Sequence, residues 1–213
     1  MTRLTLHLLP PSPNNKKVLL ALKLKGLDFD TVLYNGFDGR EAIVEATGQP
    51  LTPVLEDDGK RVYDSYGIMR YLDANFGGPK LYASTRGGMR EIERWEDLAR
   101  NGIAPLMGLV LGMAIEGKVD ADRAALANRT LNQLAVRIED ALQNSPYLMG
   151  DEPNAADLTL APFVGPATVD PEKLDKGTLF RFVAENLRLS ARFAKTHAWV
   201  ERVMAIDREP AKV

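Results

Sequence analysis

Apolar and polar side chains alternate in short runs along the first third of the chain, a pattern typical of half-buried β-strands. Residues 4–9 follow it in part, residues 29–33 are predicted to form a second strand, and a run with helical spacing, residues 16–25, lies between them. A strand, a helix and a second strand in this order imply a parallel pair of strands with a right-handed crossover.

A β-hairpin is predicted next, because the apolar pairs at 54–55 and 62–63 flank Asp58-Gly59, a dipeptide that favours a tight turn. A short helix over residues 38–46 is expected before it. Asp64 and Ser65 then offer the side-chain oxygens that cap a helix. The first 78 residues therefore read as the order βαβαββα.

The pattern changes to helices alone after a glycine- and proline-containing linker, residues 79–87. In the first of these helices Gly102 and Pro105 predict a bend. The expected elements are helices over 89–113, 121–143 and 154–164, a loop over 166–177, and one or two helices over 180–206. The chain is thus expected to have an α/β domain over residues 1–78 and an all-α domain over residues 88–213.

Composition excludes several classes of function. The net charge is −2, with 26% charged residues, so there is no broad electrostatic case for binding nucleic acid. No apolar run approaches the roughly 18 residues of a membrane span, and the first residues lead straight into a strand pattern rather than a signal peptide. A soluble cytoplasmic protein is expected.

Cysteine is absent, so the chain has no disulfide and no thiol of its own. His7 and His197 are its two histidines, both expected to be structural, and no metal site is predicted. Any sulfur chemistry must therefore use a thiol from a second molecule.

The order of the first half, with Thr52-Pro53 before the hairpin and Asp64-Ser65 at the next helix start, resembles the thioredoxin-like half of a cytosolic glutathione S-transferase. The resemblance implies that the backbone of Thr52, before a cis Pro53, pairs with the cysteinyl part of glutathione. It also implies that Asp64 meets the γ-glutamyl ammonium and Ser65 the α-carboxylate. Many family members have Val in place of Thr52 and Glu or Gln in place of Asp64.

The segment Ser12-Pro13-Asn14-Asn15-Lys16-Lys17-Val18 resembles the catalytic turn S/T-P-N-x-x-K-V of phi-type and bacterial Nu-type transferases. The resemblance makes the Ser12 hydroxyl a donor to the glutathione sulfur, with Asn14 as a second candidate. A hydroxyl donor and helix N-terminal amides favour a thiolate over a thiol. The structural alternatives are that Ser12 only caps the helix and that Asn14 is only a turn residue.

Further roles follow from the same resemblance. Gln49 and Arg40 stand where the family often places donors for the glycyl carboxylate of glutathione. Asn154 and Asp157 match the capping box of the family's helical domain. The residues expected to line a pocket for a hydrophobic electrophile are Pro11, Arg100, Met107 and Leu111, with Trp95 and Met113 as further candidates, although such side chains at helical spacing are more often core.

The sequence therefore predicts a glutathione transferase that activates the thiol of glutathione for attack on a hydrophobic electrophile, acts in detoxification, and forms a homodimer. A glutathione-dependent isomerase, peroxidase, dehalogenase or disulfide reductase would use the same site. A non-catalytic glutathione-binding or regulatory protein is the alternative from another class. Ser12 and Asn15 occupy the cysteine positions of a glutaredoxin, so a protein-thiol mechanism is excluded.

Overall fold

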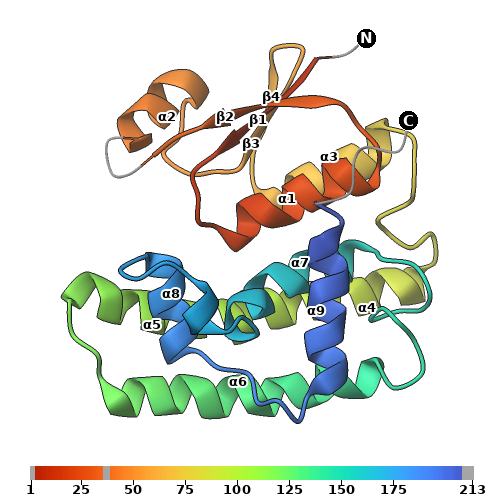
Figure 1. Ribbon diagram of the computed structural model, residues 1–213. Coiled ribbons are helices and arrows are strands. Elements are labelled where there is room, and N and C mark those ends of the chain that lie inside the picture. Colours follow the sequence, from red (N-terminus) through yellow and green to blue (C-terminus); the bar gives the residue numbers. More distant parts are fainter. Residues whose placement is uncertain (1–2, 36–38, 208–213) are drawn as a thin grey trace. The chain divides into compact units, whose positions relative to one another are not determined.

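A computed structural model of the protein describes residues 3–35 and 39–207 (Figure 1). The chain divides into two units, one of residues 1–85 with 205–213 and one of residues 86–204. The elements of the first unit are β1 (Leu4–Leu8), α1 (Pro13–Leu24), β2 (Phe29–Leu33), α2 (Gly39–Thr47), β3 (Val54–Asp57), β4 (Lys60–Val62) and α3 (Ser65–Asn75). This order confirms the predicted βαβαββα arrangement. The predicted start of the second helix, Asp38, lies outside the described residues.

The four strands form one mixed sheet in the order β2-β1-β3-β4. Strand β1 runs parallel to β2 and antiparallel to β3, and β3 pairs antiparallel with β4. The turn between β3 and β4 has positive φ angles at both Asp58 (47°) and Gly59 (86°). A tight hairpin turn that matches the twist of the strands requires this backbone, which explains the Asp-Gly sequence.

Alternation along β1 decides which layer covers each face of the sheet. Leu4, Leu6 and Leu8 are buried, and helices α1 and α3 pack side by side on one face (Figure 1). His7 points to the other face, where its ring contacts Tyr34, and the first residue of α2, Gly39, lies close to that tyrosine. Helix α2 therefore belongs to the side of the sheet opposite α1 and α3.

The segment after α3 is fastened to the first unit by buried polar groups. The Lys25 Nζ donates to the carbonyl of Pro79 at 3.1 Å and lies 3.6 Å from the Asp73 carboxylate, which also accepts from the Leu81 amide at 2.8 Å. Gly78 has φ +84° and approaches the Lys25 carbonyl so closely that a Cβ would lie 2.6 Å from its oxygen. The chain therefore leaves this unit along a fixed path.

The second unit consists of helices alone, as predicted. Its elements are α4 (Arg86–Asp97), the π-helix η1 (Leu98–Ile103), α5 (Ala104–Glu116), α6 (Ala121–Ala141), α7 (Ala155–Val164), the 3₁₀ helices η2 (Gly165–Ala167) and η3 (Pro171–Lys173), α8 (Leu179–Asn186) and α9 (Ala194–Ala205). The irregularity expected near Gly102 and Pro105 takes the form of the π-helix η1. A Cβ at Gly102 would lie 3.2 Å from Leu134 of α6, so glycine permits this close approach.

The helical run 86–116 is long and apolar enough, by length and composition alone, to pass as a membrane span. Its side chains Ile92, Trp95, Ile103, Val110 and Met113 are buried in the second unit. It is therefore a core helix.

The predicted capping box at the start of α7 is confirmed. Asn154 accepts from the Ala156 amide at 2.9 Å, and Asp157 accepts in return from the Asn154 amide at 3.1 Å. Asp157 is fully buried and also accepts from the Leu148 amide and from the indole N–H of Trp199, at 2.9 and 2.8 Å. Burial raises the pKa of Asp157, and these N–H donors oppose that rise.

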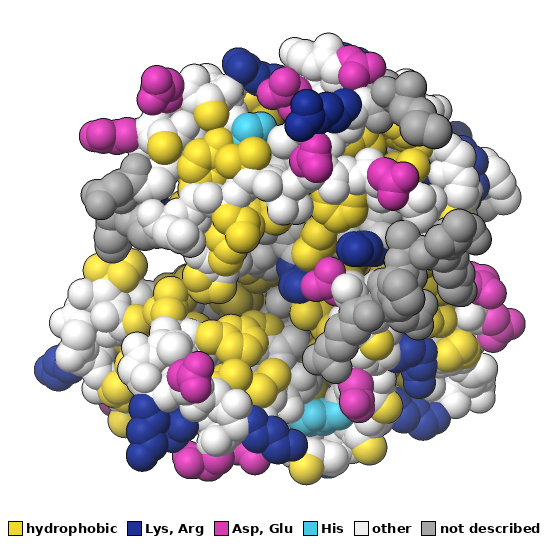
Figure 2. All heavy atoms as spheres, turned by 45° about the horizontal axis from the view of Figure 1, so that its top comes forward, with side chains coloured by type: hydrophobic (Ala, Val, Ile, Leu, Met, Phe, Trp, Pro, Cys, Tyr) yellow, Lys and Arg dark blue, Asp and Glu magenta, His cyan; other side chains and the backbone are white. Residues whose placement is uncertain are grey.

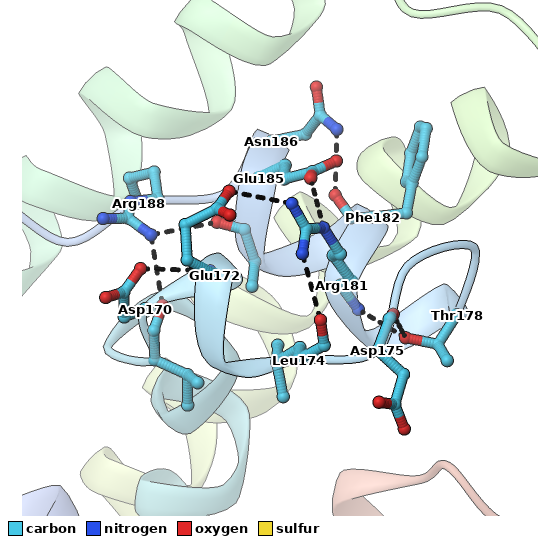
Figure 3. Close-up of polar contacts among 12 residues, drawn as sticks. Asp170, Glu172, Leu174, Asp175, Thr178, Arg181, Phe182, Glu185, Asn186 and Arg188 are labelled. Atoms are coloured by element: carbon cyan, nitrogen blue, oxygen red, sulfur yellow. Dashed lines mark hydrogen bonds and ion pairs between the residues drawn. The ribbon is translucent and has the colours of Figure 1, made fainter.

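The loop predicted over residues 166–177 is held by two arginines of the α8 region (Figure 3). Arg181 donates to the carboxylates of Glu172 and Glu185 and to the Leu174 carbonyl. Arg188 donates to the Val169 carbonyl. Two backbone carbonyls of this connection are thus bonded to arginine side chains, and the 3₁₀ helices η2 and η3 supply its local structure.

Candidate functional site

Ser12 begins α1 and caps it. Its backbone is extended (φ −149°), its hydroxyl oxygen accepts from the Asn15 amide at 3.4 Å, and Pro13 takes the first helical position. The structural alternative for Ser12 is therefore observed. It does not exclude a role in thiol activation, because a hydroxyl that accepts at its oxygen keeps its own hydrogen to donate.

Asn14 joins this turn to the start of α3. The Ser65 hydroxyl donates to the Asn14 side-chain oxygen at 3.2 Å, across 51 positions of sequence. Ser65 is buried, with 4% of its surface exposed, and Asn14 is half-buried. The structure thus brings together the turn that was predicted to activate the thiol and the residue that was predicted to bind the γ-glutamyl carboxylate.

Asp64 caps α3 with an unusual backbone. Its φ is +62° and its ψ 125°, outside the regions that L-residues prefer, and its carboxylate accepts from the Tyr66 amide at 3.3 Å. Asp64 is exposed although it caps the helix. Residues with such strained backbones concentrate at functional sites. Here the strained residue places an exposed carboxylate at the N-terminus of α3, where the helix dipole is positive.

Two cis peptide bonds flank the site. The cis bond predicted at Thr52-Pro53 is present, and Pro10-Pro11 is also cis. The Thr52 hydroxyl accepts from the Leu9 amide at 3.2 Å, so the first residue of the cis Thr52-Pro53 pair is bonded to the residue that precedes the cis Pro10-Pro11 pair. Thr52, Pro53 and the turn at Ser12 therefore lie on one framework.

Two buried polar residues of α1, Asn15 and Lys17, were quoted in the sequence motif but were given no contact there. Asn15 donates to the Leu9 carbonyl at 2.9 Å, which fixes the start of α1 against the end of β1. Lys17 is fully buried, with its ammonium 3.0 Å from the centre of the Tyr66 ring, a cation–π contact next to Ser65. The sequence feature that could have indicated them is a polar residue on the buried, otherwise apolar face of a predicted helix.

The two residues predicted to hold the glycyl carboxylate lie at opposite ends of α2. Arg40 is its second residue and is exposed. Gln49 follows its last turn, is half-buried, and donates to the Leu51 carbonyl at 2.8 Å. Among the contacts of the described residues, none joins Arg40 to Ser12, Asp64 or Ser65.

The predicted electrophile residues are divided between the units. Pro11 is exposed in the first unit, and in the second Arg100 is exposed on η1, Leu111 is half-buried and Met107 is 8% exposed. Trp95 and Met113 are buried, as core side chains are, so their core interpretation is the one observed. The pocket itself stays a prediction. No group of three or more potential metal ligands occurs among the residues described.

Acidic and basic side chains are interspersed on the face drawn in Figure 2. This mixture agrees with the small net charge of −2. The predicted site residues at the starts of α1 and α3 are instead uncharged, apart from the carboxylate of Asp64.

Comparison with known proteins identifies this arrangement. Residues 6–80 match the glutathione S-transferase N-terminal domain, and residues 120–202 match the glutathione S-transferase C-terminal domain. The chain therefore belongs to the glutathione S-transferase superfamily, cytosolic type.

Relatives of several activities share this similarity. Glutathione S-transferase GstB of Escherichia coli K12 is 27% identical over 161 residues, covering 72% of this chain and 77% of that protein. Maleylacetoacetate isomerase of Mus musculus is 29% identical over 158 residues, covering 71% and 72%. The crystal structure of β-etherase LigF from Sphingobium shares the fold, with a TM-score of 0.77 at 18% identity and coverage of 98% and 96%. The family and its use of glutathione are thereby established, and the particular reaction is not.

Proposed function

We propose that this protein is a glutathione transferase that binds glutathione in its first unit and adds its sulfur to a hydrophobic electrophile. The observation that carries the proposal is the hydrogen-bonded framework of the first unit. It ties Ser12 through Asn15 and Leu9 to Thr52, and Asn14 to Ser65. Among them, Ser12, Asn14, Thr52 and Ser65 are the residues to which the family resemblance assigns roles toward glutathione.

Each part of glutathione has a complementary partner in this proposal. The γ-glutamyl ammonium meets the exposed Asp64 carboxylate, and its carboxylate meets the hydroxyl and amide of Ser65 at the positive end of α3. The cysteinyl backbone pairs with Thr52 before the cis Pro53. Arg40 and Gln49 would donate to the glycyl carboxylate.

The chemistry depends on the ionisation of the bound thiol. A free thiol has a pKa near 8.5, and lowering it by two units needs about 2.7 kcal/mol. A Ser12 hydroxyl donor, the Asn14 side chain and the N-terminal amides of α1 can supply interactions of this size. The thiolate then forms a bond to an electrophilic carbon, and either a leaving group departs with its bonding electron pair or the electron pair of a broken π bond takes up a proton from water. No metal takes part in this step.

The remaining parts of the proposal concern the second substrate and the assembly. Residues 1–78 would bind glutathione and residues 88–213 the electrophile, with Arg100, Met107 and Leu111 as the proposed electrophile-binding residues of the second unit. A cytoplasmic homodimer that detoxifies electrophiles is the setting that the family resemblance supports.

Replacement of Ser12 tests the catalytic role. Ser12→Ala is expected to lower kcat about 10- to 100-fold, change the glutathione Kd less than about threefold, and return the pKa of the bound thiol toward 8.5. Ultraviolet difference absorbance of the thiolate measures that pKa. Ser12→Thr keeps the hydroxyl and is the matched control, expected to retain most of the activity. Unchanged turnover in Ser12→Ala would assign activation of the thiol to Asn14 instead. Asn14→Ala would then be the variant that lowers kcat.

Isomerisation is the second candidate, favoured by the similarity to a maleylacetoacetate isomerase over 71% of the chain. Conjugation consumes one glutathione per turnover, whereas isomerisation regenerates it. Incubation with maleylacetoacetate and a limiting amount of glutathione distinguishes the two. Many turnovers per glutathione would support an isomerase, and no turnover of this substrate would leave conjugation as the proposal.

A further inference from the structure

Helix α2 carries both proposed ligands of the glycyl carboxylate, Arg40 near its start and Gln49 just after its end. Its buried positions are Gly39, Ile43 and Thr47, one residue per turn along a single line. Ile43 is the one large apolar side chain among them, and Val44 is 44% exposed. Apolar packing therefore holds α2 along a narrow stripe, and the orientation of its two ends must be fixed by other contacts.

At the start of α2 that contact is Tyr34, which follows β2. Its hydroxyl is hydrogen-bonded to the Nδ1 of His7 at 2.8 Å, the two rings are stacked at 5.9 Å, and Tyr34 is 8% exposed. The backbone of Gly39 lies directly against it, since a Cβ at this position would be 3.1 Å from the Tyr34 Cβ. The first turn of α2 thus rests on a tyrosine that the buried histidine holds in place.

At the end of α2 the contact is Tyr63, which follows β4. Its hydroxyl donates to the Thr47 carbonyl at 2.8 Å and lies 4.0 Å from the Cβ position of Gly48. The Thr47 hydroxyl has one hydrogen to donate and lies 2.7 Å from the Ile43 carbonyl and 3.2 Å from the Gln49 carbonyl, so Tyr63 bonds a residue whose side chain contacts the backbone of Gln49. A second tyrosine hydroxyl therefore fixes the last turn and the residue that follows it.

We propose that Tyr34 and Tyr63 are positioning residues for glutathione, fastening the two ends of α2 so that Arg40 and Gln49 meet the glycyl carboxylate. The inference rests on the proposed glutathione site and deepens it. The two hydroxyls touch no part of the substrate in this scheme. Their loss lets α2 shift, and the glycyl end of the ligand loses its donors, whereas the thiol and the γ-glutamyl group keep theirs.

The test compares glutathione with γ-glutamylcysteine, which is the same ligand without the glycyl residue. Tyr34→Phe and Tyr63→Phe are each expected to weaken glutathione binding about 3- to 10-fold. This is the effect of losing about one hydrogen bond to the glycyl carboxylate when α2 shifts. Binding of γ-glutamylcysteine should change less than about twofold, and the pKa of the bound thiol should stay as in the wild type. Titration calorimetry gives both affinities.

Tyr71→Phe is the matched control, because Tyr71 on α3 also donates its hydroxyl to a partner in the same unit, the Asp57 carboxylate at 2.6 Å. It should leave the ratio of the two affinities unchanged. His7→Asn, which retains a polar atom near the position of Nδ1, should behave closer to the wild type than His7→Leu. Equal weakening of both ligands by the tyrosine variants, or no weakening, would overturn the proposal.

Hydrogen exchange in the ligand-free protein separates this inference from the proposed function. Amides of residues 42–47 should exchange faster in Tyr34→Phe and Tyr63→Phe than in the wild type or Tyr71→Phe. Unchanged exchange would overturn the role of the hydroxyls in holding α2. Failure of the wild type to bind glutathione would overturn the proposed function and the ligand-positioning role, while faster exchange would still establish the fastening of α2.

Discussion

His7 places an ionisable ring in the interior of the first unit, between a tyrosine hydroxyl and a carboxylate. It is 6% exposed, bonds Tyr34 through Nδ1, and has its Nε2 3.8 Å from the Glu56 carboxylate. Burial lowers the pKa of His7 below its ordinary value, Glu56 acts to raise it, and Arg61 acts to lower it. The ring is therefore neutral in the folded protein at neutral pH.

A pH dependence of stability follows from this shift. The pKa of His7 is lower in the folded than in the unfolded chain, where it is about 6.5. Its contribution to stability is thus full above pH 6.5 and is lost as the pH falls from there toward the folded-state pKa. His7→Asn cannot titrate, so its unfolding free energy should fall less than that of the wild type between pH 7 and pH 5. Urea unfolding across this range measures both slopes, and equal slopes would show that His7 does not contribute.

At the scale of single residues, the sequence predicts side chains whose role is local. Ser12, Asp64 and Asn154 cap the helices at which they were expected, because capping depends on neighbours a few positions away. Asn15 and Lys17 could not be found in this way. Their roles depend on Leu9 and Tyr66, which only the folded chain brings to them.

At the scale of elements, Gly78 shows how one backbone position sets the exit from α3. Its φ of +84° favours glycine, and the Lys25 carbonyl occupies the space that a side chain would need. The same carbonyl belongs to the residue whose ammonium holds Pro79 and Asp73. A side chain at this position would therefore have two effects. It would strain the backbone, and it would displace Lys25 from its ion pair with Asp73.

Gly78→Ala is expected to destabilise the protein by about 2–4 kcal/mol, from the unfavourable φ and the backbone clash combined. Gly77→Ala is the matched control, because its φ is not positive and no atom lies within 4 Å of its Cβ position. The control should change the unfolding free energy by less than about 0.5 kcal/mol. Chemical denaturation measures both variants, and a similar effect for the two would contradict the assignment to Gly78.

The elements themselves are the part of the fold that the sequence predicts best. The first strand and the hairpin at Asp58-Gly59 agree with the structure because partial alternation and turn chemistry are properties of adjacent residues. The long helix predicted over 89–113 instead contains a π-helical stretch at Leu98–Ile103. The close approach of Gly102 to α6 favours that stretch, and such a contact has no signature within a window of sequence.

At the scale of the whole molecule, the chain passes twice between the two units. The first passage is at residues 85–86, and the second is where α9 ends at Ala205 and the chain rejoins the first unit. There the Asp207 carboxylate accepts from the Lys16 ammonium of α1 at 2.6 Å. The second unit is therefore connected at both of its ends to the first, so we expect the two to unfold together.

The positions of the tryptophans make this expectation measurable. Trp95 and Trp199, the chain's 2 tryptophans, both belong to residues 86–204, so their fluorescence reports on the second unit alone, whereas far-ultraviolet circular dichroism reports on both units. We expect one unfolding midpoint from the two signals.

Glutathione at about 100 times its Kd should stabilise the folded state by about 2.7 kcal/mol and move both midpoints together, although its proposed site is in the first unit. Ser65→Ala, which removes a proposed ligand contact, should reduce the shift in both signals at the same glutathione concentration, to about 1.4 kcal/mol if the Kd rises tenfold. A dichroism midpoint that rises while the fluorescence midpoint stays fixed would show that the units unfold independently, and the chain connections would then carry no cooperativity.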